Sequence, residues 1–479
     1  MTLPPLRGIM RLTFGPLSAG LVLLLVTGCG GDREPSSVSE DPDWEAVVKE
    51  DFSAGKLPEG WEITSGKAEV VGGALVVEGK PEGGGPESAT CEFTILLPGA
   101  CPDAVRLEYD AWFPRDVDVG PNADLSALLH ADVQKPGYLV QFGGRGNRAT
   151  RILANGVDLV QTSDTNVRIV GGKRYHIVAE HVGQFVRMQV DSREVLRLRD
   201  FFPLSGGRAG LYSWGKGARF DNVRLSRRRE APPSSKLAEA DKLYLAGDYV
   251  GANKLYVGFR VTHADDAEAP LALYKSGLSL MNQSDTEGAQ SAFETLQNSE
   301  LGAWAELALA EVEARRGKGE EAVKHLCAAS ASADRDAAAL VRSSIIYLGL
   351  RTPASRGVDA AVPILQEARK FLPDWQYEWL ANETAGTGDY TRTHGRIDLA
   401  VNFYAAALRA FPDVRDACAD SLLGLGLASL EHAPDKPDIA IKAFERVLSE
   451  YPEQTRQCTL VREKLAELAK KKNAPPPPK

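Results

Sequence analysis

The segment Ala400–Pro412, AVNFYAAALRAFP, decides the fold of the second half of the chain. An alanine precedes a large apolar residue, Tyr404, by four positions, and a proline follows the alanine after twelve. The same pair recurs as Ala252/Tyr256, Ala289/Phe293, Ala322/Leu326, Ala361/Leu365 and Ala440/Phe444, and prolines at 373 and 452 repeat the spacing. The intervals between the alanines are 37, 33, 39, 39 and 40 residues. This period predicts stacked helical pairs, because each unit can bury its apolar face only against its neighbours.

The pattern resembles the tetratricopeptide repeat, a helix–turn–helix of about 34 residues with small residues where helices touch. Gly277 fits the small packing residue of a first helix, and Gly317 fits a turn. The longer intervals predict long loops in ASADRDAA, ANETAGTGDYTRTHG and EHAPDKPD. The resemblance implies an all-α array over residues 237–472 that binds a protein partner, with Lys275, Glu306 and Arg342 as examples of first-helix positions. Residues 459–472 fit a polar capping helix.

Residues 45–228 have a different pattern, typical of β structure. Short runs of β-branched and aromatic residues are separated every eight to twelve positions by Gly, Pro, Asn or Asp. Apolar and polar residues alternate along Tyr175–Val190, and Asn155-Gly156 and Val182–Gln184 predict hairpin turns. His176 and His181 are separated by an odd number of positions, so a regular strand places them on opposite faces. The series predicts a β-sandwich or jelly roll.

This half resembles the concanavalin A-like lectin/glucanase superfamily, the jelly-roll group that includes laminin-G-like modules. The resemblance rests, in chain order, on Asp51-Phe52, Gly60-Trp61, Gly73–Leu75, Gly137-Tyr138, Phe142–Gly144, Lys173–His176, Val190-Asp191, Gly210–Tyr212 and Phe220–Val223. It implies a fold that binds or cleaves glycans. The predicted fold class is therefore an all-β jelly-roll sandwich followed by an all-α repeat solenoid, joined by a linker over residues 229–236.

Catalytic acids are the first functional question for such a fold, because its glycosidases place two carboxylates across a sugar. A laminarinase-type signature has the form Glu-x-Asp-x-x-Glu. Glu108 and Asp110 match its first two acids, but Phe113 occupies the third position. We therefore predict no catalytic residues and interpret both acids as solvent-facing. Serine-hydrolase elbows, Walker loops and HExxH helices are also missing from the sequence.

Two binding sets remain as hypotheses. Tyr138, Arg145, Asn147, Arg148 and Trp214 combine aromatic faces with hydrogen-bonding groups, as a glycan site requires; the alternative is that both aromatic residues belong to the core. The oxygen-bearing residues Asp116, Asp118, Asn122 and Asp124 would suit calcium, although their spacing is not that of an EF-hand and such residues also cap turns. We predict no other metal or cofactor.

The first 28 residues have the plan of a secretory signal: Arg7 and Arg11 supply positive charge, and an apolar run follows at residues 21–26. The run is too short to span a bilayer, which needs about 20 apolar residues. It ends in Val26–Cys29, VTGC, which resembles the lipobox of bacterial lipoproteins. The resemblance implies cleavage before Cys29 and a lipid on its thiol. The alternative is an ordinary signal peptide with an incidental cysteine.

The segments beside the folded halves are polar. Residues 29–44 are rich in Gly, Pro, Ser and acids and should form a flexible tether, and residues 473–479 form a proline-rich tail. Gly30 follows the lipid-bearing cysteine, so the aspartate that retains some lipoproteins at the inner membrane is missing, which favours the outer membrane.

Composition narrows the class of partner. A formal net charge of -9 argues against nucleic acid, which normally requires a basic face. Cys91 and Cys101 could form a disulfide in an oxidising compartment, whereas Cys327, Cys418 and Cys458 lie far apart on predicted helices and should be buried. The sequence thus predicts a non-enzymatic, membrane-anchored envelope lipoprotein that binds a glycan or protein. The alternatives are an envelope carbohydrate-active enzyme and a purely structural assembly protein.

Overall fold

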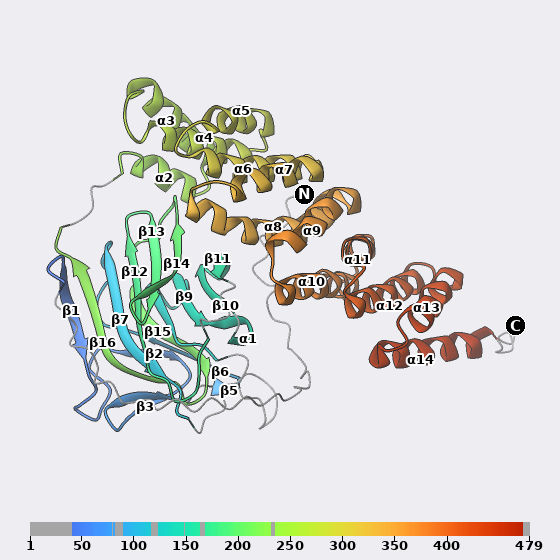
Figure 1. Cartoon of the computed structure of the whole chain (residues 1–479), viewed down its shortest axis with the longest axis horizontal. Helices are drawn as coiled ribbons and strands as arrows, with labels where there is room; N and C mark the ends of the chain where they lie inside the picture. The colour runs from blue at the N-terminus through green and yellow to red at the C-terminus, as the bar shows by residue number, and fades with distance from the viewer. Residues whose placement is uncertain are drawn as a thin grey trace, which may run out of the picture.

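The computed structural model of the 479-residue chain describes residues 41–78, 80–81, 90–115, 123–147, 149–162, 168–230 and 235–472. An antiparallel β-sandwich precedes an array of helices (Figure 1), which confirms the predicted fold class. Across these residues, none of the helices is long and apolar enough to cross a membrane. Cys29 lies outside the described residues.

The sandwich consists of two sheets, here named sheet A and sheet B. Sheet A has the spatial order β14 (Arg193–Arg199), β13 (Phe185–Val190), β12 (Tyr175–Val182), β7 (Val105–Trp112), β16 (Arg219–Arg228), β4 (Ala74–Val77) and β3 (Ala68–Val71), and β1 (Trp44–Glu50) also pairs with β16. Sheet B has the order β11 (Val157–Thr162), β10 (Ala149–Ala154), β9 (Tyr138–Gly143), β8 (Ser126–Ala131), β15 (Arg208–Gly215), β6 (Thr90–Leu96) and β2 (Glu62–Ser65), and β5 (Lys80–Pro81) pairs with β6. The short helix α1 (Gly144–Asn147) follows β9.

Alternation along the strands builds the core between the sheets. On β7 the odd-numbered Leu107 and Tyr109 point inward and are fully buried, and on β12 Ile177 and Ala179 do the same. Asn155 and Gly156 both have positive φ values, 48° and 82°, and connect β10 to β11 as the sequence predicts.

The helical half is a series of antiparallel pairs. The first helices are α2 (Ala238–Leu245), α4 (Ala269–Asn282), α6 (Gly302–Arg315), α8 (Arg335–Arg356), α10 (Asp374–Thr393) and α12 (Arg415–His432). The second helices are α3 (Tyr249–Thr262), α5 (Thr286–Leu296), α7 (Gly319–Ser330), α9 (Val358–Phe371), α11 (Ile397–Ala410) and α13 (Asp438–Glu450), and α14 (Thr455–Lys472) follows the last pair.

The predicted alanine–large pairs all lie on the second helices, and every one of these side chains is fully buried. Sixteen positions before each large residue, the first helix carries a small residue: Ala240, Gly277, Ala310, Gly349, Gly388 and Ala428. The close approach explains the choice, because a Cβ atom at Gly277 would lie 2.5 Å from the Phe293 ring, and one at Gly388 would lie 2.6 Å from Tyr404. Small-against-large packing therefore sets the contact between the two helices of a repeat, although in the last pair Gly426, and not Ala428, lies against Phe444.

One predicted loop is wrong. Residues 381–395, ANETAGTGDYTRTHG, mostly continue α10 instead of forming a loop. The threonines do not break the helix, because the Thr384 and Thr387 hydroxyls donate to the carbonyls four residues earlier. The glycine that looked like a loop residue, Gly388, is the small residue opposite Tyr404.

The Gly277–Phe293 contact gives a direct test of this packing. We expect Gly277→Ala to destabilise the protein by about 1–3 kcal/mol, because the new methyl group overpacks a buried ring. The matched control is Gly258→Ala on the exposed face of α3, where a Cβ atom would meet nothing within 4 Å. The control should gain up to about 1 kcal/mol from helix propensity. Urea unfolding measures both, and equal effects would contradict the packing rule.

Candidate functional sites

The outer face of sheet B carries a row of polar side chains. The strand registers place Arg151 opposite Gln141, and Tyr212 opposite Ser126 and Thr94. Trp214 lies two residues beyond Tyr212 on β15 and is partly exposed. Two aromatic rings and several hydrogen-bonding groups therefore share one face.

Asp124, two residues before the start of β8, holds this row together. Its Oδ2 accepts hydrogen bonds from Ser126 Oγ (2.8 Å) and Gln141 Nε2 (2.7 Å), and its Oδ1 accepts from the Trp214 backbone N–H (2.5 Å). Gln141 Oε1 in turn accepts from Arg151 Nε (2.7 Å). Burial raises the pKa of Asp124 to about 6, although these hydrogen bonds act to lower it. Within the described residues, the indole Nε1 of Trp214 is buried without a hydrogen-bond partner.

The predicted glycan-binding set is not brought together. Tyr138 is fully buried between the sheets, where its hydroxyl donates to Asp200 Oδ2 (2.6 Å) and accepts from the Leu204 N–H (2.9 Å). Asn147 bonds the backbone N–H and carbonyl of Ile169 at 2.8 Å each. For Tyr138 the alternative is confirmed, because it belongs to the core, and Asn147 is likewise committed to structural contacts. Trp214 lies on the outer face of sheet B, and the side chains of Arg145 and Arg148 lie outside the described residues.

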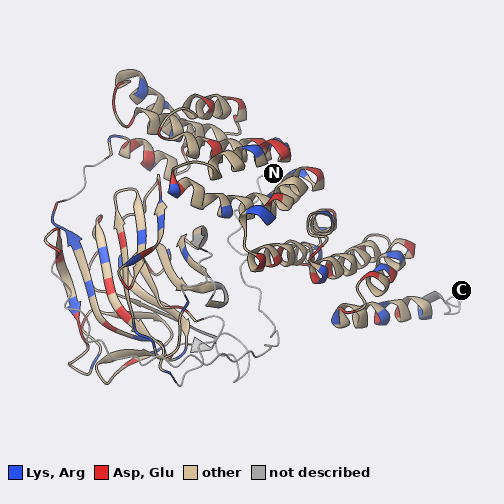
Figure 2. Ribbon diagram, in the orientation of Figure 1, with Lys and Arg blue, Asp and Glu red and all other residues tan. Residues whose placement is uncertain are grey.

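The two acids of the glucanase-like signature lie on the outer face of sheet A, the opposite side of the sandwich. Asp110 is largely buried among Arg174 Nη2 (2.9 Å), His176 Nδ1 (2.9 Å) and Asn222 Nδ2 (2.8 Å). Burial acts to raise the pKa of Asp110, but the hydrogen bonds from His176 and Asn222 and the charge of Arg174 outweigh it and hold the pKa below its usual value. Figure 2 shows such charges of both signs along β7, β12 and β16. Asp110 is therefore held in ion pairs instead of facing solvent freely.

The calcium hypothesis gains no support from Asp124, whose carboxylate oxygens are used by protein donors and which is fully buried. Asp116, Asp118 and Asn122 lie outside the described residues. Among the residues that are described, no group of three or more His, Cys, Asp or Glu side chains could hold a metal ion.

The predicted Cys91–Cys101 disulfide is wrong, because Cys101 is a buried free thiol. Cys91 lies at the start of β6, whereas the Cys101 N–H bonds the Gly207 carbonyl beyond the other end of that strand. The strand alone separates these ends by about 3.3 Å per residue, and a disulfide requires Cα atoms within about 7 Å. Cys418 and Cys458 are buried as expected, and Cys327 is half-buried.

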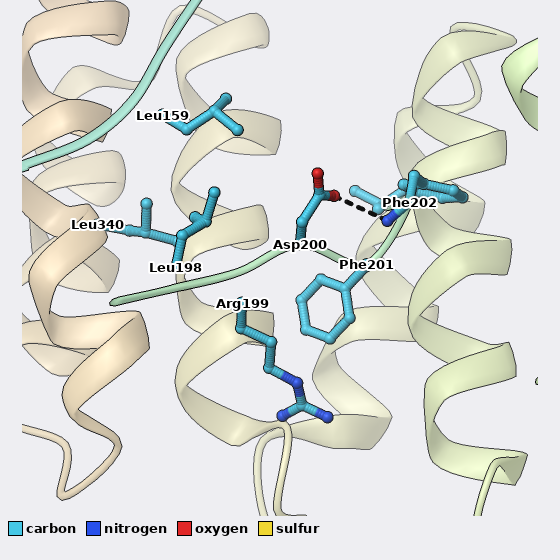
Figure 3. Close-up of a pocket in the computed structure, with 8 residues that line it drawn as sticks. Leu159, Leu198, Arg199, Asp200, Phe201, Phe202 and Leu340 are labelled. Atoms are coloured by element: carbon cyan, nitrogen blue, oxygen red, sulfur yellow. Dashed lines mark hydrogen bonds between the residues drawn. The ribbon is translucent and has the colours of Figure 1, made fainter. Parts of the chain in front are cut away.

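The second functional feature is the junction between the sandwich and the repeats, which the sequence did not predict. The loop after β14 carries two adjacent phenylalanines (Figure 3). The Phe201 ring lies 4.7 Å from Trp304 on α6 and 4.9 Å from Tyr274 on α4, centroid to centroid. Phe202 stacks on Tyr244 of α2 at 4.0 Å. Both side chains therefore insert among the first helices of the first three repeats.

A charged contact extends the junction to the fourth repeat. Arg197 on β14 donates to both oxygens of Asp336 on α8, at 2.8 Å each. Beside Phe201, a cavity of about 180 Å³ is lined by Leu159, Leu198, Leu278, Leu340 and the segment 199–202. These contacts fall on α2, α4, α6 and α8, so it is the first-helix side of the array that meets the sandwich.

The first-helix positions named from the sequence have structural partners. Lys275 is almost fully buried at the junction, where its Nζ donates to Asp241 (2.7 Å) and lies 4.8 Å from the centre of the Phe202 ring. Glu306 accepts from Gln297 (2.8 Å) and bonds His325 (2.6 Å). The signal that could have revealed the junction is the segment DFFP, residues 200–203, which places two large apolar residues in a turn.

The tetratricopeptide repeat family model matches residues 271–299 and 420–453, which confirms the predicted repeat in those two segments. No curated protein matches the chain.

Several solved structures are similar to the sandwich. The carbohydrate-binding module CBM66 from Bacillus subtilis is 19% identical, with 35% of this chain and 94% of that chain covered and a TM-score of 0.28. The Emp47p carbohydrate recognition domain is 11% identical, with 37% and 93% covered and a TM-score of 0.29. SCLam, a non-specific endo-β-1,3(4)-glucanase from family GH16, is 13% identical, with 41% and 95% covered and a TM-score of 0.30. At these identities the similarity concerns the fold alone.

The junction makes a testable prediction. We expect Phe201→Ala to cost about 3 kcal/mol, because a buried aromatic side chain is removed from between Tyr274 and Trp304, and to let the sandwich separate from the repeats. Small-angle X-ray scattering should then show a larger maximum dimension, and urea unfolding should show the lost stability. Val261→Ala, on an exposed position of α3, is the control and should change neither. An unchanged scattering profile for Phe201→Ala would contradict the role of the junction.

Proposed function

We propose that this protein is a lipid-anchored binding protein of a bacterial envelope, and that the outer face of sheet B takes a glycan while the later repeats take a protein partner. The observation that carries the proposal is the row of polar side chains beside Tyr212 and Trp214. An aromatic face and nearby hydrogen-bond donors and acceptors match the alternating apolar and hydroxyl surfaces of a sugar.

The placement of the repeats supports the second part. The sandwich contacts the first helices of the first four repeats, whereas α10 to α14 lead away from it in Figure 1. Stacked repeats offer extended binding surfaces along their first helices. The later repeats therefore have the geometry to hold a partner while the earlier ones hold the sandwich.

The sequence around Cys29 supports the anchor. The short apolar run and the lipobox-like VTGC predict lipid attachment, and Gly30 favours the outer membrane. A membrane-held binding protein needs no catalytic set, and Asp110 is held in ion pairs on the outer face of sheet A.

A second candidate function, glycoside hydrolysis, is favoured by Asp124. Its pKa of about 6 suits a general acid. Glu92 on β6 lies on the same face, on the other side of the β15 strand that carries Trp214. Two carboxylates beside an aromatic ring would suit a sugar substrate. We favour binding, because Asp124 is fully buried and its oxygens already accept three hydrogen bonds.

The glycan proposal predicts a loss of binding in one variant. Affinity electrophoresis of the full chain in gels containing soluble polysaccharides would identify a ligand. We expect Trp214→Ala to weaken that binding by about 2 kcal/mol, roughly 30-fold in Kd, because it removes the aromatic platform. Phe185→Ala, on the outer side of sheet A, is the control and should bind normally. Equal binding by wild type and Trp214→Ala would contradict this site.

The same polysaccharides separate binding from hydrolysis. Binding alone predicts no release of reducing ends from wild type. Release that is lost in both Asp124→Asn and Glu92→Gln would establish the hydrolase instead.

The anchor predicts that Cys29→Ser abolishes incorporation of labelled palmitate and moves the protein from the detergent phase to the aqueous phase in a phase-partition experiment. The control is Cys327→Ser, which removes a cysteine of the helical half instead. This variant should still incorporate labelled palmitate. Labelling of Cys29→Ser would refute the lipid site.

A further inference from the structure

The junction loop, residues 200–207, is held at both ends by side chains from sheet B. At its start, Tyr138 bonds Asp200 and Leu204, and Asp200 Oδ1 accepts from the Phe202 N–H (2.8 Å). At its end, the Gly206 carbonyl lies 2.9 Å from His130 Nδ1. These anchors fix the turn that presents both phenylalanines to the repeats.

His130 belongs to a buried chain of four groups. Its Nε2 lies 2.7 Å from His181 Nδ1, and His181 Nε2 lies 2.9 Å from the Gly183 carbonyl. Both rings are almost fully buried. The order is therefore carbonyl, imidazole, imidazole, carbonyl, and the Tyr138 ring packs against both histidines.

The number of N–H groups on the two imidazole rings decides how many of the three hydrogen bonds can form. Each carbonyl accepts only, so the two outer ring nitrogens must both be protonated to bond Gly206 and Gly183. The inner contact between His130 and His181 needs a third N–H. Two neutral imidazoles supply only two, so one of the three contacts lacks a proton. One added proton completes all three, whereas a second places two N–H groups and two positive charges against each other.

The surroundings offer little compensation for a second charge. The Asp103 charge favours the protonated form of His130, while Val105 and Val186 lie opposite His181 on the neighbouring strands. Two neighbouring groups are neutral at ordinary pH: burial raises the pKa of the Cys101 thiol to about 12, and burial and Asp200 raise the pKa of Tyr138 still further.

The order of protonation follows from these contacts. Burial lowers the pKa of His130 below the ordinary value of 6.5. Burial and the charge of His130 lower the pKa of His181 to about 4. Because both pKa values are lower in the folded chain, the neutral pair contributes stability that is fully present above pH 6.5 and is lost as pH falls through the folded pKa values.

We propose that the His130–His181 pair is an acid-sensitive latch on the 200–207 loop, and that double protonation of the pair releases the loop and undocks the sandwich from the first repeats. The second proton breaks the inner contact and forces the rings apart. The contact between His130 and the Gly206 carbonyl is then lost, and the end of the turn that carries Phe201 and Phe202 is held only by the backbone bond from the Cys101 N–H to the Gly207 carbonyl.

Hydrogen exchange of the full chain, corrected for the intrinsic pH dependence of exchange, tests the latch. We expect protection of residues 200–207 and of α4 to fall at least tenfold between pH 7 and pH 4, while α12 stays protected. His181→Gln keeps a donor and an acceptor but does not titrate in this range, so its loss should be less than threefold. An equal loss in wild type and His181→Gln, or a parallel loss in α12, would overturn the proposal.

A control separates the latch from the other titratable contact at the junction. Asp336→Asn removes the carboxylate that binds Arg197, and the tenfold loss between pH 7 and pH 4 should persist; its disappearance would assign the effect to Asp336 and overturn the latch. If His181→Gln does not fold, NMR of ¹³C-labelled histidines in the wild type decides. His130 and His181 should both titrate below the ordinary histidine pKa of 6.5, His181 near pH 4, and titration of both at or above 6.5 would overturn the proposal.

Discussion

The insertion of Phe201 and Phe202 among α2, α4 and α6 is the contact on which the arrangement of the molecule depends. The sandwich and the later repeats each have an apolar cluster of their own, whereas the apolar cluster of the first repeats includes Phe201 from the sandwich. Two phenylalanine side chains join them, since each buries a large apolar surface against aromatic partners. The Arg197–Asp336 pair restrains the orientation of β14 relative to α8, because two parallel hydrogen bonds between a guanidinium and a carboxylate require a specific geometry.

The sequence predicts the repeats well because their packing is periodic. An alanine and a large residue four positions apart mark one helix face, and this relation holds in all six pairs. A long interval between repeats wrongly predicts a loop only where polar residues such as Thr384 and Thr387 hydrogen-bond their hydroxyls to carbonyls of the same helix. In the sandwich, the alternation of apolar and polar residues likewise separates side chains that face the core from those that face outward. The predicted all-β fold of this half is therefore correct.

The functional residues are harder to predict, because they depend on register between distant strands. No sequence signal distinguishes Tyr138 from Trp214 as a binding residue. Tyr138 nevertheless lies between the sheets, whereas Trp214 lies on the outer face of sheet B. The His130–His181 contact joins strands from different sheets, and His130 has a positive φ of 57° at the end of β8, which alternation cannot anticipate. Asp110 matches a catalytic signature locally, but its partners are distant in sequence: Arg174 just before β12, His176 on β12 and Asn222 on β16.

The pairing of β1 with β16 has a mechanical consequence. Trp44 at the start of β1 is the Cα partner of Arg228 at the end of β16, so the chain enters and leaves the sandwich at neighbouring points. A pull between the N-terminal side and the repeats would therefore act at one end of the sandwich, on the last residues of β16, which pair with β1 on one side and with β7 on the other. Arg106 reinforces that edge, because it lies 4.4 Å from the centre of the Trp44 ring and 3.0 Å from Asp41.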